Sequence, residues 1–175
     1  ISKAGAKFDF EKAKWFNHEW IKRSSTESLL PKIKTVSEHH QVDADEAYVS
    51  RVLDAVKERL TFVEDFWSQA SFFFLQPAEY DLNAVKPKWT AEKTAFFEGI
   101  NQSFEGFDTW KAAELEPFFK DAIQASGMKM GELMMPFRIM LVGGKFGPDV
   151  FQIVELLGKN EVIARVKKAL KEFDA

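Results

Sequence analysis

A glycine-rich segment, Gly143–Pro148, is the first feature of this sequence whose residue types could bind a ligand. It is not a nucleotide-binding P-loop, because the Lys-Ser/Thr ending and a preceding strand are both missing. It leads into an expected helix whose first N–H groups, from Asp149, Val150 and Phe151, lack partners within the helix and attract acceptor groups. The competing interpretation is a glycine that ends one helix, followed by Pro148 in the first turn of the next.

Two arginines are candidates for recognising a ligand through the planar donor fork of the guanidinium group. Arg138 lies among apolar residues, so it either snorkels from a helix or directs its fork at a ligand. Arg59 closes a helix rich in acidic residues. The competing interpretation for Arg59 is an ion pair with a carboxylate one helical turn away.

Methionine is concentrated in one short stretch of the chain. Its side chain is flexible and polarizable, so a cluster can form an adaptable binding face or fill irregular space in a core. The first interpretation predicts a helical protein-interaction module that docks a partner, and the second predicts buried side chains. The five methionines are Met128, Met130, Met134, Met135 and Met140.

The remaining residue types do not indicate a catalytic or metal centre. The chain has no cysteine, which excludes disulfides, thiolate zinc sites and cysteine nucleophiles. Of its three histidines, His39 and His40 are adjacent and would point about 100° apart on a helix, while His18 fits a surface helix. We therefore expect no catalytic residue and no metal site in this chain.

The charge distribution limits how the chain could bind a polyanion. Its formal net charge of −3 excludes nucleic-acid binding through an overall positive charge. Binding through a local basic patch is still possible. Residues 1–34 carry eight Lys/Arg against four Asp/Glu, whereas residues 38–65 carry three against eight. A polyanion should therefore avoid the second stretch, apart from isolated basic side chains that project from it.

Helices must position these residues, because apolar side chains recur with a 3.6-residue period and no alternating strand pattern occurs. Asp9 is expected to cap a helix over about residues 10–22. Because a proline disrupts a helix interior, the next helix is expected to begin near Pro31. A third helix should begin at Asp43 or Asp45.

The middle of the chain contains the expected domain boundary. Residues 62–75 are apolar nearly all round and should be buried, and the proline-containing segment 76–89 reads as a loop. We therefore expect two small helical subdomains in an orthogonal packing, over residues 1–82 and 83–175.

The second half is expected to contain helices separated by glycine and proline. Thr90 should cap one helix, and Asp108 or Thr109 the next, within which Pro117 should cause a break or kink. A further helix covers about residues 130–142. The last helix should have an apolar inner face and a basic outer face. Its inward side chains should be Val162, Ile163, Val166, Leu170 and Phe173, and its outward ones Arg165, Lys167 and Lys168.

Composition agrees with a globular protein, and the helical periodicity makes its expected fold class all-α. The chain of 175 residues is 46% apolar and 29% charged, which is not a disordered composition. No apolar run of about 18 residues occurs, so no membrane span is expected. The sequence shows no basic-plus-apolar leader, from which we expect a cytoplasmic location and no membrane partner.

Two long motifs resemble bacterial glutamyl-tRNA synthetases. The second is similar to that family's C-terminal signature and reads GMKMGELMMPFRIMLVGGKFGPDVFQIVELLG. The resemblance covers residues 1–175 in the same order. The first resembles the segment after the stem-contact region, and its matching residues are Gly5, Ala6, Lys7, Phe8, Asp9, Glu11, Lys12, Trp15, Asn17, Trp20, Ile21 and Lys22.

The resemblance implies a class I synthetase that joins glutamate to its tRNA with ATP and Mg²⁺. The family's HIGH-type and KMSKS-type motifs do not occur here. The chain is therefore expected to be inactive alone, to need no cofactor of its own, and to adjoin an N-terminal catalytic half. The family has a helix cage followed by a second helical domain, and both bind the anticodon. We expect a cytoplasmic monomer whose partner is the anticodon loop of tRNA(Glu).

The same resemblance implies roles for particular residues. Arg59 falls where family members read the third anticodon base, and Arg138 where they contact the first. Gly147, Pro148 and Val150 fall where they contact the first and middle bases. At Gly147, where some relatives have a hydroxyl residue, only backbone contact is expected. Basic residues of the first helix are candidates for contacts with the tRNA backbone, against the alternative of a solvated face; they include Lys7, Lys12, Lys22 and Arg23.

Overall fold

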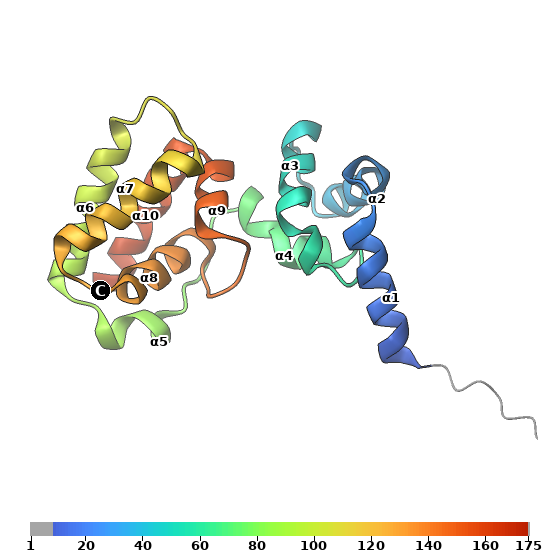
Figure 1. Ribbon diagram of the computed structural model, residues 1–175, viewed down its shortest axis with the longest axis horizontal. Helices are drawn as coiled ribbons and strands as arrows, with labels where there is room; N and C mark the ends of the chain where they lie inside the picture. Colours follow the sequence, from blue (N-terminus) through green and yellow to red (C-terminus); the bar gives the residue numbers. More distant parts are fainter. Residues whose placement is uncertain (1–8, 175) are drawn as a thin grey trace, which may run out of the picture. The chain divides into compact units, whose positions relative to one another are not determined.

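The computed structural model describes residues 9–174, and most of them are helical (Figure 1). Within this range no residue belongs to a strand, which confirms the all-α prediction. Two short 3₁₀ helices, η1 (Lys57–Arg59) and η2 (Lys86–Lys88), accompany the α-helices. The α-helices are α1 (Phe10–Arg23), α2 (Thr26–His39), α3 (Glu46–Val56), α4 (Asp65–Phe74), α5 (Leu82–Val85), α6 (Ala91–Glu105), α7 (Ala112–Ser126), α8 (Met130–Val142), α9 (Val150–Leu157) and α10 (Lys159–Asp174).

The helices form two compact units, of which the first ends at Ser71 and the second begins at Phe72. This division falls inside α4, so it lies before the loop from which the boundary at residue 82 was inferred. A division by compactness does not test where the two expected anticodon-binding subdomains meet. The limits 1–82 and 83–175 therefore stay a prediction.

In the first unit, α3 packs against α2, and η1 packs against α1 and α3. Asp9 caps α1 as predicted, since its side chain accepts from the backbone N–H of Lys12 at 3.1 Å. Asp45 caps α3, and its side chain accepts from the N–H of Tyr48 at 3.2 Å. The buried apolar side chains of this unit include Ile21, Leu29, Ile33, Val49, Val52, Leu53, Val56, Leu60, Phe66 and Ala70.

Two helices continue through a proline at which the sequence predicted an interruption. α2 begins at Thr26 and contains Pro31, and α7 begins at Ala112 and contains Pro117. In both helices the proline is the sixth residue, so it forfeits one hydrogen bond, to the carbonyl of the second residue. The start of α2 is fixed instead by the Ser25 side chain, which accepts from the N–H of Ser28 at 3.3 Å.

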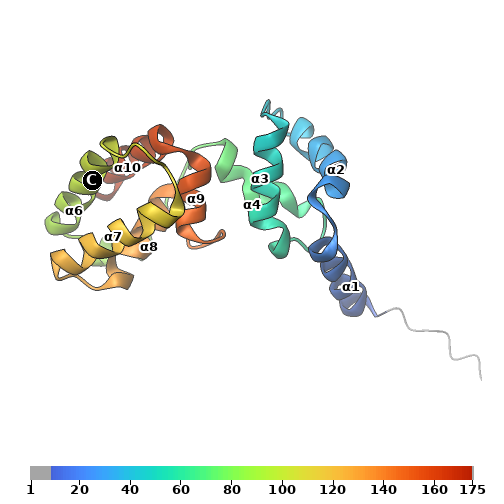
Figure 2. The same ribbon diagram turned by 45° about the horizontal axis from the view of Figure 1, so that its top comes forward.

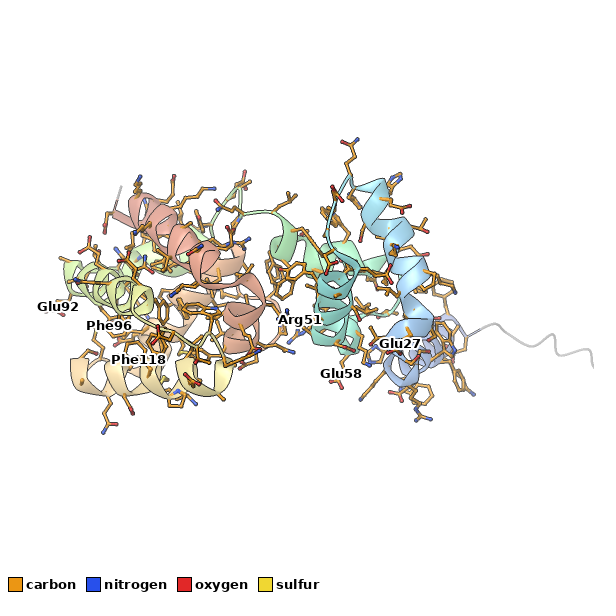
Figure 3. The ribbon with its side chains drawn as sticks, turned by 90° about the horizontal axis from the view of Figure 1, so that it is seen from above. Glu27, Arg51, Glu58, Glu92, Phe96 and Phe118 are labelled. Carbon is orange, nitrogen blue, oxygen red and sulfur yellow. The ribbon has the colours of Figure 1, made fainter. Side chains whose placement is uncertain are left out.

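In the second unit, α10 packs against α6, α8 and α9, while α7 packs against α8 and α9 (Figures 1 and 2). Stacked phenylalanines fill the space between them. The rings of Phe119 and Phe137 stack with centroids 4.5 Å apart, and Phe151 meets Phe119 edge-on at 5.7 Å. Phe96 of α6 and Phe118 of α7 extend this cluster (Figure 3).

The start of α7 differs from the prediction because its cap comes from a distant residue. The helix begins at Ala112, four residues after Asp108 and three after Thr109. The Glu155 carboxylate on α9 accepts from the N–H of Ala112 at 2.8 Å and pairs with Lys111 at 2.9 Å. Sequence proximity cannot reveal a cap supplied from 43 residues away.

Candidate nucleic-acid interface

Arg138 on α8 holds the segment that follows its own helix, which we call the 143–149 loop. The side chain is partly buried. Of the two expected uses, snorkelling and a fork directed at acceptors, the structure shows the second, with acceptors that belong to the protein. The Nη1 group donates to the carbonyl oxygens of Phe146 at 3.0 Å, Gly147 at 3.3 Å and Pro148 at 2.6 Å.

The first half of the 143–149 loop is fixed by contacts with the segment before α5. Gly143 ends α8 with φ +86, and a Cβ there would lie 2.6 Å from the carbonyl oxygen of Glu79, so the position needs glycine. The carbonyl of Gly143 accepts from the N–H of Asp81 at 2.8 Å. Lys145 forms an ion pair with the Asp81 carboxylate at 3.5 Å.

The second half of the loop turns inward at Gly147 and Pro148, which are both buried. Gly147 has φ +97, and a Cβ would lie 3.2 Å from the ring of Phe72 and 3.3 Å from Cδ1 of Ile153. These two predicted site residues shape the loop.

Phe146 is the residue of this loop that sequence reasoning missed. Its ring is 47% exposed and meets Phe72 edge-on with centroids 5.8 Å apart. An exposed aromatic ring offers a face on which an unpaired base can stack. The available signal was a phenylalanine in a glycine-rich turn, where apolar burial is not expected.

The first N–H groups of α9 were expected to lack partners, but two N–H groups in the first turn of this helix donate to a side chain of the protein. Asp149 is the N-cap, and its carboxylate accepts from the N–H of Phe151 at 2.9 Å and of Gln152 at 3.1 Å. Pro148 precedes this cap and therefore lies outside the helix, not in its first turn. The side chain of Val150 is buried, so it supports the loop from inside.

Arg165 on α10 is the largest departure from the sequence prediction, because it faces inward and is only 1% exposed. Its Nη1 donates to the carbonyls of Phe72 at 2.7 Å and Leu141 at 2.6 Å, and Nε donates to Glu161 at 2.7 Å. The two carbonyls lie in the last turns of α4 and α8, where helices lack internal donors. Arg165 thus fixes the end of α8 from which the 143–149 loop departs.

Arg59 belongs to the first unit and lies on η1, beyond the end of α3 rather than on the helix itself. Its side chain is exposed, and within residues 9–174 it forms no hydrogen bond or ion pair. The intrahelical ion pair considered for it is therefore not formed. Its neighbour Glu58 projects from the same turn (Figure 3), and Lys57 pairs with Asp54 at 3.5 Å.

Contacts from α1 hold the segment that follows Arg59. Leu60 is fully buried, and its carbonyl accepts from Nδ1 of His18 at 2.8 Å. The carbonyl of Thr61 accepts from the amide of Asn17. His18 and Asn17 therefore have a structural role. Their hydrogen bonds fix the backbone next to Arg59, while the Arg59 side chain is exposed to solvent.

Four basic residues were expected to contact the tRNA backbone. The structure describes three of them, Lys12, Lys22 and Arg23, and all three are exposed on α1. Lys7 lies outside the described residues. Arg23 forms an ion pair with Glu19 at 3.2 Å, and Lys12 lies 5.9 Å from the centroid of the Phe16 ring. The helix also exposes four large aromatic side chains, Phe10, Trp15, Phe16 and Trp20.

The methionine cluster does not form a continuous exposed surface. Met140 is fully buried, Met128, Met134 and Met135 are partly buried, and Met130 is 42% exposed. Only Met140 therefore belongs to the core, and a docking face built from the cluster has no support.

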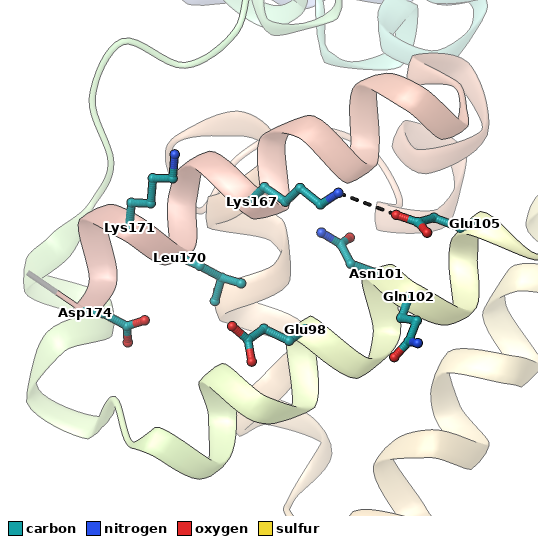
Figure 4. A pocket seen from close by; sticks show the side chains of 8 residues that line it. All are labelled: Glu98, Asn101, Gln102, Glu105, Lys167, Leu170, Lys171 and Asp174. Carbon is teal, nitrogen blue, oxygen red and sulfur yellow. Dashed lines mark hydrogen bonds and ion pairs between the residues drawn. The ribbon is translucent and has the colours of Figure 1, made fainter.

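The described residues offer no metal cluster of three or more His, Cys, Asp or Glu side chains. No described helix is long and apolar enough to cross a lipid bilayer. A groove of about 540 Å³ between α6 and α10 is lined by polar side chains and Leu170 (Figure 4). Its three carboxylates outnumber its two ammonium groups, so it does not suit a phosphate backbone.

Two solved structures resemble this chain along its whole length. A glutamate tRNA ligase from Elizabethkingia meningosepticum, crystallised with its amino acid, matches with a TM-score of 0.90 and 35% identity, over 99% of this chain and 34% of that one. The glutamate-tRNA synthetase of Elizabethkingia anophelis matches with a TM-score of 0.85 and 35% identity, over 98% of this chain and 33% of that one.

The sequence comparisons agree. The glutamate–tRNA ligase of Christiangramia forsetii is 36% identical over 170 residues, which is 97% of this chain and 34% of the relative, and that of Porphyromonas gingivalis is 35% identical over the same shares. The chain thus spans about a third of the length of the curated relatives it matches. The anticodon binding domain family matches residues 11–170, and the chain belongs to this family.

Proposed function

We propose that this chain recognises the anticodon loop of tRNA(Glu) on behalf of a glutamate–tRNA ligase. The observation that carries the proposal is the family match over residues 11–170. The structure supplies groups suited to this use, namely an exposed arginine on a fixed turn and a braced loop with an exposed aromatic ring. Proteins read splayed RNA bases by stacking and by hydrogen bonds to base edges.

In the second unit, Arg138 would act in two ways. It keeps the 143–149 loop in one conformation through three carbonyls, and it would contact the first anticodon base. The backbone of Gly147, Pro148 and Val150 would lie along the first and middle bases, with Phe146 as a stacking surface. A loop held in place before binding loses little conformational entropy when the base arrives.

In the first unit, Arg59 would read the third anticodon base. Its planar fork can form two hydrogen bonds with a base edge. The contacts of His18 and Asn17 with the next residues limit the entropy lost on binding. Lys7, Lys12, Lys22 and Arg23 would neutralise backbone phosphates, and the modest net charge makes the affinity depend on these few contacts.

The ligation step would belong to the parts of the relatives that this chain does not match. In that protein, ATP and Mg²⁺ would activate glutamate in an N-terminal catalytic half, which would be the protein partner of this chain. This chain would need no cofactor and would have no activity alone. The whole protein would act as a monomer in the cytoplasm.

Binding to RNA stem-loops tests the proposal directly. We expect the chain to bind the anticodon stem-loop of tRNA(Glu) more tightly than one with a changed third anticodon base, measured by fluorescence anisotropy at fixed salt. A stem-loop with the same stem and an unrelated anticodon serves as the control. Equal affinity for all three RNAs would contradict anticodon reading.

A further inference from the structure

A pocket in the first unit lies next to the segment that carries Arg59. Its volume of about 430 Å³ is within the range of small-ligand sites, about 300–1,000 Å³. Three elements line it: α1, α2 and the segment that follows η1. The lining residues are Asn17, Trp20, Lys32, Thr35, Val36, Phe62, Val63 and Glu64.

Two aromatic side chains of this pocket are exposed. Trp20 is 50% exposed and Phe62 is 40% exposed. Of the five large aromatic side chains that the described part of this unit exposes, these two line the pocket, whereas Phe10, Trp15 and Phe16 do not. Aromatic faces left in solvent at a pocket are the feature that nucleic-acid-binding proteins use to stack unpaired bases. Stacking accepts any base, because every base has a π face.

The charged groups of the pocket complement the other parts of a nucleotide. The Lys32 ammonium lies 5.4 Å from the centroid of the Trp20 ring, and within residues 9–174 it has no carboxylate partner. A cation beside a stacking surface is placed to meet the phosphate of a stacked nucleotide. The Glu64 carboxylate is exposed and can accept hydrogen bonds from the amino group of cytosine or adenine.

The wall of the pocket and the Arg59 turn are fixed by the same hydrogen bonds. Asp65 accepts from the N–H of Thr61 at 3.0 Å and of Phe62 at 2.7 Å. The amide of Asn17, which lines the pocket, donates to the carbonyl of Thr61. Arg59 and Phe62 are therefore held on one short segment, so an RNA that reaches one is close to the other.

We propose that this pocket binds an unpaired nucleotide of the RNA that Arg59 reads. The base stacks on Trp20 and Phe62, its phosphate meets Lys32, and Glu64 favours bases with an exocyclic amino group. The inference rests on the proposed function, because it takes the occupant to be part of the same RNA. The Lys32 ammonium group, which has no carboxylate partner among the described residues, argues for a phosphate-bearing occupant over an apolar protein segment.

The test compares two tryptophans on one helix. Trp20→Ala removes a stacking surface of the pocket, and Trp15→Ala is the matched control, since Trp15 is 56% exposed on α1 and does not line the pocket. We expect Trp20→Ala to weaken binding of the anticodon stem-loop about tenfold and Trp15→Ala to leave it unchanged. Circular dichroism checks that both variants keep their helices.

Two further variants test the charged groups. Lys32→Gln should lower the slope of log affinity against log salt by about 0.7, the value for one single-strand phosphate contact. Glu64→Gln should reduce the preference for cytosine or adenine over uracil at the bound position. An unchanged salt slope together with an unchanged base preference would overturn the assignment.

The outcomes separate this inference from the proposed function. If the chain discriminates anticodons and Trp20→Ala binds as tightly as Trp15→Ala, the pocket is not a nucleotide site, while anticodon reading stands. If the chain binds no stem-loop, anticodon reading fails. Titration with cytidine monophosphate, followed by NMR at the Trp20 indole N–H, then decides the pocket alone: a saturable shift supports it, and no shift overturns it.

Discussion

The two units use their arginines in opposite ways. In the second unit, Arg138 and Arg165 donate to backbone carbonyls of the protein itself, at the 143–149 loop and at the ends of α4 and α8. In the first unit, Arg59 is exposed on a turn whose backbone is fixed by other residues. One arrangement makes the arginine part of the fold, and the other leaves it available to a ligand.

This difference predicts where a substitution has its effect. Removing an arginine whose donors serve buried carbonyls leaves those carbonyls without partners, so stability falls and binding falls with it. Removing an exposed arginine leaves the fold unchanged, so a loss of binding stands alone. Measuring stability and RNA affinity for the same variants separates the two arrangements.

The largest effect is expected for Arg165→Met. The substitution leaves the carbonyls of Phe72 and Leu141 without their donor and leaves Glu161 without its ion pair, so we expect a loss of about 3 kcal/mol in the free energy of unfolding. Urea denaturation followed by circular dichroism measures it.

The control for Arg165→Met is Lys167→Met on the same helix. Lys167 is exposed and pairs with Glu105 at 3.4 Å, so its loss should change the free energy of unfolding by less than about 0.5 kcal/mol. Equal effects of the two substitutions would contradict a specific use of Arg165 at the helix ends.

A smaller loss is expected for Gly147→Ala. The backbone of Gly147 has φ +97, and the new Cβ would lie 3.2 Å from Phe72, so we expect a loss of about 2 kcal/mol in the free energy of unfolding. Gly131→Ala is the control, because a Cβ there meets no atom within 4 Å and alanine favours the helix. A Gly147→Ala variant as stable as Gly131→Ala would show that the loop is not rigid.

The same contrast explains which features the sequence revealed. Helix periodicity and the caps at Asp9 and Asp45 are local, so the all-α class and the starts of α1 and α3 follow from neighbouring residues. The cap of α7 by Glu155 and the inward Arg165 depend on contacts between segments far apart in the chain. A charged residue on an amphipathic helix reads as solvated unless its distant partners are known.

For a related reason, the sequence predicted some residues of the candidate site and missed others. The motif containing Arg138 and Gly147 predicted residues that the structure brings together at one loop. Nothing in that motif indicated that the arginine would hold the loop or that Phe146 would be exposed, since both follow from the inward turn at Gly147.

Arg138→Ala and Arg59→Ala form the direct test of the contrast. Each should cost about 1–3 kcal/mol of base discrimination, at the first anticodon base for Arg138 and at the third for Arg59. Arg138→Ala should also lower the melting temperature, because three carbonyls lose their donor, whereas Arg59→Ala should not. Stem-loops altered at one base each, with thermal melts of both variants, give the measurement. A lowered melting temperature in Arg59→Ala would remove the distinction between the two units.

The smallest effect is expected for Lys12 on α1, whose contribution to binding would depend on charge alone. Lys12→Gln removes one exposed ammonium group without a carboxylate partner among the described residues, so it should reduce affinity for all stem-loops equally. If Lys12 contacts a phosphate, the slope of log affinity against log salt should fall by about 0.9 for a duplex stem. Lys171→Gln is the control, since Lys171 lies in the net-negative groove between α6 and α10 (Figure 4). Equal slopes for the two variants would mean that the Lys12 side chain is merely solvated and meets no phosphate of the RNA.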